Sequence, residues 1–307
     1  MIKRIHKHHR PTGWSQELQD LVRGASGGFL FGIPLLYTIE VWQIGSYTEP
    51  PLMLCILAVT YVVIFLLNHT EGFRQKQRDG ALNAAAESIE ALAIGMLCAA
   101  FMLVLLRRIT WDTSLGEALG KIIFEGVPFS LGVTLARLLL TGDSSPLQQG
   151  ENYQSQMRQS SKHSISKVLQ TNKFSFHETL ADISATLFGA IIIAFSIAPT
   201  DEITTLAAAA SPPWLLALIA VSLLISYGIV FAAGFTNQYQ RRQQQGLFQT
   251  PEGETVFSYL ISLLASALML WFFQRLGLSD PWFVWLRYTL VLGLPATIGG
   301  AAGRLAV

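Results

Sequence analysis

Charged residues are scarce in this sequence of 307 residues, of which Asp, Glu, Lys and Arg make up only 13%. Soluble domains usually carry about 25% charged residues. The shortage is concentrated in long apolar runs, and hydrophobic residues reach 51% of the chain. Most of the chain is therefore expected to have lipid as its solvent. A formal net charge of only +1 gives no overall field that would attract a polyanion, so no nucleic-acid partner is expected.

Cysteine is equally rare, and both cysteines, Cys55 and Cys98, lie inside apolar runs. This placement excludes a disulfide framework and a thiolate metal site, and it predicts two small core residues. The absence of a Gly-rich phosphate-binding loop excludes ATP-driven pumping by this chain alone. We expect no cofactor, and the sequence leaves open whether a metal is bound. For His6, His8 and His9 a basic flank in solvent is the preferred interpretation.

Eight stretches are long and apolar enough to cross a membrane, since a span of hydrocarbon needs roughly 20 mostly apolar residues. They are residues 21–43, 50–68, 86–106, 115–140, 179–198, 212–234, 254–273 and 282–304. Tryptophan recurs near the predicted ends of these stretches, as in interfacial aromatic belts. These tryptophans are Trp42, Trp111, Trp214, Trp271, Trp282 and Trp285. The predicted fold class is an all-α membrane protein with eight transmembrane helices.

Lys and Arg set the predicted orientation, because they are enriched on the cytoplasmic side of membrane proteins. With the basic N-terminal segment of residues 1–20 inside, few of the 21 basic residues fall on the outer half of the membrane. Those that do are Arg107, Arg108, Lys121, Arg275 and Arg287. Both termini are therefore predicted to be cytoplasmic. No apolar segment directly follows the basic N-terminus, so a cleaved signal peptide is not expected.

Residues 141–176 form one long connection that is rich in Ser, Gln and Asn. Such a stretch cannot bury enough apolar surface to fold alone, so it is predicted to be a flexible cytoplasmic linker. It separates residues 21–140 from residues 177–307, and each of these parts holds four of the predicted helices.

The two parts also resemble each other in sequence. A shift of 167 residues places Pro128 on Pro295 and Arg108 on Arg275, while shifts of 162 and 157 align the second and first helices. The first-helix match rests on residues 30–32 and 187–189, both Leu-Phe-Gly. This order predicts two tandem four-helix repeats. Because four is even, the repeats should have parallel orientation and place any shared pathway at the interface between them.

The first predicted helix contains Leu30-Phe-Gly-Ile-Pro-Leu-Leu-Tyr-Thr-Ile-Glu-Val-Trp42, preceded by Arg23-Gly24. This opening resembles that of a family of bacterial integral membrane proteins of unknown function. The resemblance covers most of the membrane region. It implies a bacterial inner (plasma) membrane protein and brings no activity with it.

Small residues recur at every fourth position on the first and fifth predicted helices. They are Gly24, Gly28 and Gly32 on the first, and Ala181, Ala185 and Gly189 on the fifth. Such stripes let helix backbones approach closely, so they are predicted helix-packing surfaces. Whether they face the other repeat, a second subunit or a pore is left open, and so is a homo-oligomer.

Two prolines, Pro128 and Pro295, lie near the middle of the fourth and eighth predicted helices. Each removes a backbone donor and leaves the carbonyl of Phe124 or Val291 without its usual partner. A packed kink is the favoured interpretation. The alternative is a broken helix that lines a substrate site.

Charged pairs are expected at matching depth near the cytoplasmic side, Glu87 with Arg137 in the first half and Glu254 with Arg304 in the second. The favoured interpretation is a structural ion pair in each half, since the charges also suit the helix dipoles. A cytoplasmic gate or proton site is the alternative.

Three further charged residues, Glu117, Lys121 and Glu125, recur at four-residue intervals on the fourth predicted helix. An intramembrane carboxylate is costly and usually faces the bundle interior or water. Glu125 is expected beside the carbonyl that Pro128 frees, so the sequence predicts a hard-cation or proton site there. Alternatively, the helix begins late and leaves Glu117 and Lys121 at the interface.

Glu90 and Asp182 are further candidates for a polar path from the cytoplasm. Glu90 lies one turn deeper than Glu87, and Asp182 lies about one turn into the fifth predicted helix. For both, a carboxylate at a helix start in the interface is the favoured interpretation.

These features favour a channel or secondary transporter for a small ion, either a cation or a proton, whose partners are the lipid bilayer and that ion. A scaffold or sensor that acts through the 141–176 linker is the alternative. A remote alternative is an intramembrane serine protease, because the residues around Ser26 resemble the serine motif of rhomboid proteases and His69 could act as the base. We expect no enzyme. The sequence does not distinguish a channel from a coupled transporter.

Overall fold

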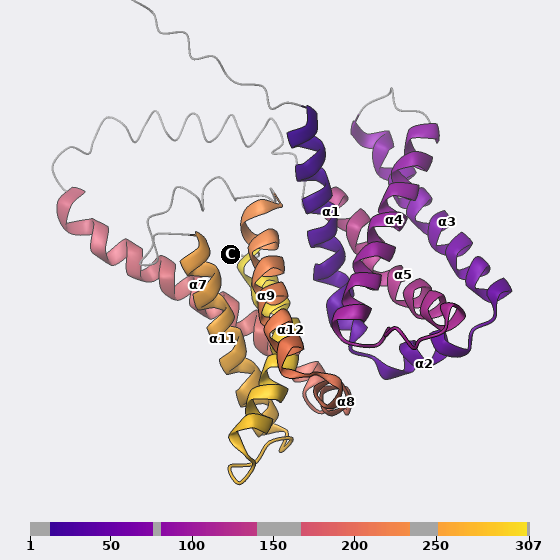
Figure 1. Cartoon of the computed structure of the whole chain (residues 1–307). Helices are drawn as coiled ribbons and strands as arrows, with labels where there is room; N and C mark the ends of the chain where they lie inside the picture. Colours follow the sequence, from indigo (N-terminus) through magenta and orange to yellow (C-terminus); the bar gives the residue numbers. More distant parts are fainter. Residues whose placement is uncertain (1–12, 76–80, 140–166, 234–250, 306–307) are drawn as a thin grey trace, which may run out of the picture.

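The computed structural model describes residues 13–75, 81–139, 167–233 and 251–305, and every element in these ranges is helical. The first half contains α1 (Gly13–Leu36), α2 (Ile39–Tyr47), α3 (Pro50–Gln75), α4 (Ala81–Leu105) and α5 (Leu115–Leu139). The second half contains α7 (Lys167–Ile197), α8 (Glu202–Ala209), α9 (Pro212–Tyr227), the π-helix η1 (Gly228–Ala232), α11 (Pro251–Phe272) and α12 (Trp282–Leu305). Figure 1 shows the two halves side by side.

Six helical segments are long and apolar enough to cross a membrane, and the number rises to eight if each of two bent pairs counts as one span. The six are α3, α4, α5, α9 continued by η1, α11 and α12. The bent pairs are α1 with α2 and α7 with α8, whose axes turn by 92° and 93°. The protein is therefore an all-α, multi-pass membrane protein.

The first and fifth predicted spans correspond to these two bent pairs. The stretch 21–43 is not one straight helix, because Thr38 adopts an extended backbone (φ −133°, ψ 104°) between α1 and α2. The Trp42 indole folds back and donates a 2.9 Å hydrogen bond to the carbonyl of Leu36, which would otherwise be left open at the end of α1. The stretch 179–198 likewise belongs to a longer helix, α7, which turns into α8.

The starts of α1 and α7 also differ from expectation. Helix α7 begins at Lys167, inside the segment 141–176 that was expected to be a linker, and α1 begins at Gly13, inside the expected basic segment 1–20. The rest of the expected linker up to residue 166 lies outside the described residues, as do residues 1–12.

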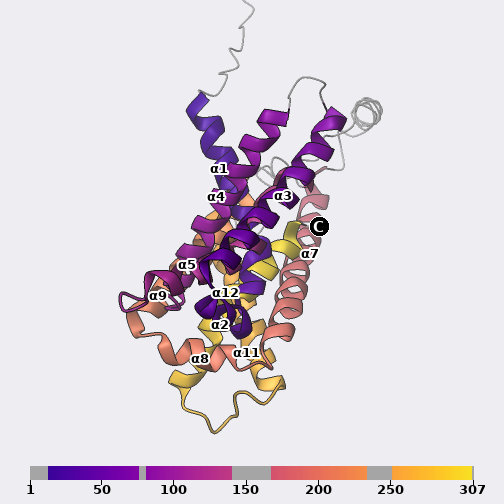
Figure 2. The same ribbon diagram turned by 90° about the vertical axis from the view of Figure 1, so that its right-hand side faces the viewer.

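The last helix of each half contacts every other described helix of that half, and α8 lies crosswise at one end of the second half (Figure 2). Helix α5 packs against α1, α2, α3 and α4, and α12 packs against α7, α8, α9 and α11. Consequently every residue from Leu290 to Ala301 on α12 is buried. The halves meet where α1 contacts η1 and α12, and where α4 contacts α9.

Glycine permits the closest helix contacts within each half. A Cβ atom added to Gly27 of α1 would lie 2.6 Å from the carbonyl oxygen of Gly132 of α5. In the second half a Cβ atom on Gly189 of α7 would lie 2.1 Å from the carbonyl oxygen of Gly299 of α12. No real side-chain carbon tolerates such distances, so these backbones approach only because the side chains are absent.

The small-residue stripes face these same contacts inside their own halves. Gly24 and Gly28 lie against Val133, and Gly32 lies against the Phe129 ring, all on the α5 side of α1. On α7, Ala185 and Gly189 face the backbone of α12. The side chain of Ala181 lies outside the described residues.

Candidate functional site

Among the residues of the first half whose burial is described, one carboxylate is buried. Glu125 lies on α5, its residue is 1% exposed, and among the described residues its Oε1 atom has no hydrogen-bond partner. At about 1.5 Å per residue, it is about 15 Å inward from the first residue of α5. The Trp42 indole on α2 lies next to this carboxyl group. An unsatisfied, buried carboxylate is costly, and such groups are found mainly at functional sites.

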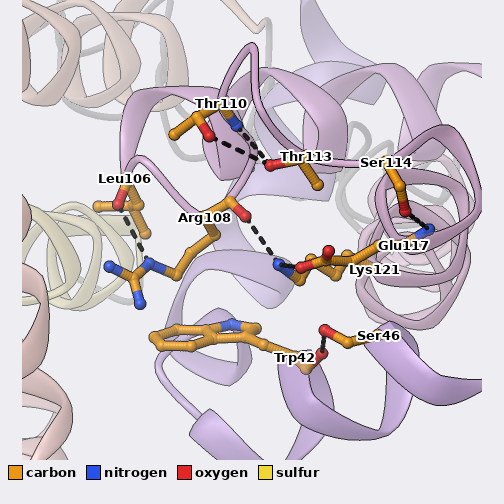
Figure 3. Close-up of polar contacts among 9 residues, drawn as sticks. All are labelled: Trp42, Ser46, Leu106, Arg108, Thr110, Thr113, Ser114, Glu117 and Lys121. Atoms are coloured by element: carbon orange, nitrogen blue, oxygen red, sulfur yellow. Dashed lines mark hydrogen bonds and ion pairs between the residues drawn. The ribbon is translucent and has the colours of Figure 1, made fainter.

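One turn of α5 away from Glu125, the positive charge of Lys121 is neutralised by an ion pair with Glu117. Its Nζ atom donates to the Glu117 carboxylate at 2.5 Å and to the Arg108 carbonyl at 2.9 Å (Figure 3). Lys121 is buried, while the Glu117 side chain is partly exposed. The predicted stripe therefore separates into an outer ion pair and, one turn deeper, Glu125.

Trp42 has the opposite environment to the one predicted from its position in sequence. It is buried, not interfacial, and the Arg108 guanidinium lies 5.1 Å from the centre of its ring (Figure 3). Partial burial lowers the pKa of the Arg108 guanidinium, because it removes water from the charged form. The same loss of water strengthens the cation–π contact between the two side chains.

Glycine brings α2 close enough to place Trp42 there. A Cβ atom on Gly120 of α5 would lie 1.9 Å from the carbonyl oxygen of Gly45 of α2. Helix α2 therefore rests directly on the α5 backbone at the level of Lys121, whose backbone nitrogen would lie 2.9 Å from a Cβ atom on Gly45. This contact, together with the bend after Leu36, positions the indole between Glu125 and Arg108.

The bend between α1 and α2 also joins the two halves. The Tyr37 hydroxyl donates a 2.7 Å hydrogen bond to the carbonyl of Val291 on α12. This is the carbonyl that Pro295 was expected to free. The backbone N–H of Ile39 donates at 3.4 Å to Glu202, a carboxylate that is buried at the start of α8. Glu202 thus lies at the N-termini of both short helices, where their dipoles favour a negative charge.

A third contact between the halves lies in the connection after α4. The Arg107 guanidinium lies 5.6 Å from the ring centre of Trp214 on α9. Arg107 and Arg108 therefore each cover a tryptophan, one in each half.

A second buried charge cluster lies in the second half, between the start of α11 and the end of α12. Arg304 is 1% exposed, pairs with Glu254, and donates to the Ser258 hydroxyl at 3.0 Å. Its guanidinium also lies 5.5 Å from the ring centre of Phe231 in η1. The pairing of Arg304 with Glu254 is the one expected from sequence.

The π-helix η1 lies between this cluster and α1. The Arg23 Nε atom donates to the Ala233 carbonyl at 2.8 Å, and the Ser26 hydroxyl lies 3.5 Å from where a Cβ atom of Gly228 would be. Since π-helical turns often mark functional positions, this contact between α1 and η1 is a further candidate for a functional position.

The remaining candidate residues lie apart from Glu125. Glu87 and Glu90 are exposed near the start of α4, and Asp182 is half-buried on α7. The side chain of Arg137 lies outside the described residues, so its pairing with Glu87 stays a prediction.

Both α5 and α12 continue as helices through their prolines, with Pro128 half-buried and Pro295 fully buried. Among the described residues, no three His, Cys, Asp or Glu side chains converge on a metal-sized site. Of the cysteines, Cys98 is buried as expected, whereas Cys55 is exposed on α3.

Sequence reasoning did not single out four residues of this site, namely Tyr37, Trp42, Arg108 and Glu202. Trp42 and Arg108 were noted only for the aromatic belt, the orientation and the repeat. Proline at position 295 was the available signal for Tyr37, because a freed carbonyl inside a membrane requires a donor. Pro295 thus indicated the acceptor, the carbonyl of Val291, but no signal in the sequence indicated which residue would be the donor.

Comparison with known proteins gives one match. Residues 20–307 match the family described as "Putative integral membrane protein (DUF2391)". No curated protein and no solved structure matches the chain.

Proposed function

The chain belongs to this family of integral membrane proteins, and from that premise we propose that it is a channel or secondary transporter for a small cation or proton, with Glu125 on the path of the ion. The observation that carries the proposal is the burial of Glu125 with an Oε1 atom that lacks a hydrogen-bond partner among the described residues. A charged side chain at the centre of a membrane helix costs at least about 2.5 kcal/mol. The aligned position in the second half is Leu292, which is fully buried. A purely structural helix would do better with leucine, so retention of the carboxylate favours a role in ion movement.

The architecture that we propose for this function is eight spans in two tandem, parallel four-helix repeats. Both halves begin with a long helix that turns by about the same angle into a short one, and both continue with three long segments. The turns after α4 and α11 also have the same backbone conformation at one residue. Arg107 and Gln274, which are 167 residues apart, have φ angles of 56° and 57°.

Hydrogen bonds in these two turns support the same correspondence. The N–H of Arg108 donates to the Leu103 carbonyl, and the N–H of Arg275 donates to the Leu270 carbonyl. Each pair is again related by 167 residues. The glycine contacts suggest a different match for the first helix, since Gly27 and Gly189 hold equivalent places against Gly132 and Gly299. The corresponding shift is 162 residues (189 − 27), five more than the Leu-Phe-Gly match gives.

For orientation, we propose a bacterial inner-membrane location with both termini in the cytoplasm. The turns at residues 106–114 and 273–281 would then face outward. A Thr113→Cys variant in a background without Cys55 and Cys98 should react with a membrane-impermeant maleimide from outside intact cells. Labelling only after the membrane is opened would reverse the orientation.

The proposed function is tested by flux from proteoliposomes. Purified protein would be reconstituted and loaded in turn with protons, sodium, potassium or calcium. Wild type should dissipate at least one gradient faster than protein-free liposomes, and Glu125→Gln should abolish that flux. The matched control is Glu40→Gln, which removes an exposed carboxylate from α2 and should leave the flux unchanged. Equal flux in wild type and Glu125→Gln would refute the role of Glu125.

We also propose that the chain is not a serine protease. Ser26 is buried against η1, and the His69 ring lies 5.7 Å from the Phe65 ring on α3. A fluorophosphonate probe should therefore not label the folded protein at Ser26. Labelling that disappears in Ser26→Ala would reverse this assignment.

A further inference from the structure

Resting on the proposed function, we infer that the ion handled at Glu125 is the proton and not a metal cation. The inference comes from the ligands, charges and donors around this carboxylate, which suit a group that takes up a single proton on one oxygen.

The first reason is the number of oxygen ligands. Calcium takes six to eight oxygen ligands, and magnesium requires six in an octahedron. No three acidic, histidine or cysteine side chains converge at any place in the described residues. One turn outward on α5, the oxygens of the Glu117 carboxylate and the Arg108 carbonyl both accept from Lys121. A proton needs only one oxygen, and Oε1 of Glu125 has no competing partner among the described residues.

The second reason is the surrounding charge. Helix α5 packs against α1, α2, α3 and α4. The facing stretches 25–36, 51–67 and 91–106 of α1, α3 and α4 contain no charged residue, and α2 contributes only Glu40, which is exposed. The titratable side chains in these three stretches are Cys55, Tyr61 and Cys98. In addition, Tyr47 lies on α2 and Tyr37 lies at the bend between α1 and α2.

The fixed charges nearest to Glu125 are therefore two cations, Lys121 and Arg108, and the carboxylate of Glu117. Because Glu117 neutralises Lys121, the remaining fixed charge is that of the Arg108 guanidinium. A metal cation bound at Glu125 would keep its charge beside this guanidinium in a largely apolar setting, where repulsion is strong. A proton instead converts Glu125 into a neutral acid, which the apolar surroundings favour.

The third reason is Trp42. Its ring face, which could hold a cation, is covered by the Arg108 guanidinium. Its indole N–H is a donor only, so it can bond to a carboxyl oxygen but cannot ligate a metal. In this structure the indole N–H donates to the carbonyl of Leu36, and the indole lies next to the Glu125 carboxyl group.

Infrared difference spectroscopy of the reconstituted protein tests the inference without relying on transport. Acidification should produce the carbonyl band of a protonated carboxyl group that is absent in Glu125→Gln and is shifted in Glu125→Asp. Sodium, potassium and calcium, each added at constant pH, should leave the Glu125 bands unchanged. A carboxylate band that is shifted by one of these metals and lost in Glu125→Gln would overturn the inference. Glu40→Gln should reproduce the wild-type spectra.

Flux separates the inference from the proposed function. A proton gradient, with membrane potential clamped by potassium and valinomycin, should be dissipated by wild type and not by Glu125→Gln. Sodium and calcium gradients should persist in both. Metal flux that depends on Glu125 and is independent of pH would overturn the proton assignment and leave the proposed function standing. No flux of any ion in wild type would refute the proposed function, and the infrared titration would still decide whether Glu125 binds a proton.

Discussion

The Tyr37 hydroxyl donates a hydrogen bond to the carbonyl of Val291, across the junction between the two halves of the protein. The acceptor is available because Pro295, four residues later, has no N–H to offer it. Pro295 on α12 leaves the Val291 carbonyl free, and the bend after α1 places the Tyr37 hydroxyl where it can donate to that carbonyl. The bend between α1 and α2 is held to the second half by this contact and by the bond from Ile39 to Glu202.

Tyr37→Phe should destabilise the protein, because it leaves the buried Val291 carbonyl without a donor. An unsatisfied buried acceptor costs about 1–3 kcal/mol. The midpoint of thermal unfolding in detergent should fall. Tyr47→Phe removes the hydroxyl of an exposed tyrosine on the neighbouring short helix and should have no effect. A wild-type midpoint for Tyr37→Phe would show that another group satisfies Val291.

The buried ion pair between Arg304 and Glu254 should show strong coupling. Glu254→Leu leaves the guanidinium of Arg304 buried without its counter-charge, which costs about 3 kcal/mol or more. Adding Arg304→Met should recover much of that loss, since a pair of apolar side chains replaces the buried pair without an unpaired charge.

Unfolding of both single variants and the double variant completes the mutant cycle. Glu252→Leu, at an exposed carboxylate in the same turn of α11, is the control and should leave stability near wild type. Additive losses in the cycle would mean that the two side chains contribute independently.

Gly189→Ala should separate α7 from α12. The added methyl group would lie 2.1 Å from the Gly299 carbonyl oxygen, which belongs to backbone and cannot rotate away. We expect a lower unfolding midpoint and less monodisperse protein in detergent. Gly116→Ala is the matched control, because a Cβ atom there meets nothing within 4 Å. Equal behaviour of the two variants would contradict the glycine contact.

Long apolar runs made the helices predictable, but not the path of each helix. The sequence predicted the bounds of α5, α11 and α12 closely, since each is a run long enough to span the membrane. It predicted α3 and α4 too short, because α3 continues to Gln75 and α4 begins at Ala81. It missed the bend at Tyr37 and Thr38, because neither residue is a helix breaker and Pro34, the nearest one, lies inside α1. The bend depends on partners far away in sequence, namely Val291 and Glu202.

The sequence likewise predicted only some residues of the candidate site. Glu125 stood out because a carboxylate is rare in an apolar run, and the pairing of Arg304 with Glu254 followed from equal spacing in a repeat. Trp42 was misassigned to the interface, since tryptophan near a predicted helix end usually lies there. Its burial results from the close approach of Gly45 to Gly120, which no local pattern in the sequence indicates.

We propose that Glu125 faces the path of the ion, and this placement can be measured as the accessibility of position 125 to an aqueous reagent. Glu125 is 1% exposed in this structure, so the claim requires that water reach it in another conformation. Glu125→Cys and Leu292→Cys would be compared in a background with Cys55→Ala and Cys98→Ala. Leu292 is the aligned residue in the second half and is fully buried. A small, positively charged methanethiosulfonate reagent should modify the cysteine at position 125 in membranes and should not modify the one at position 292. A cysteine at position 125 that is as unreactive as the one at position 292 would contradict the account.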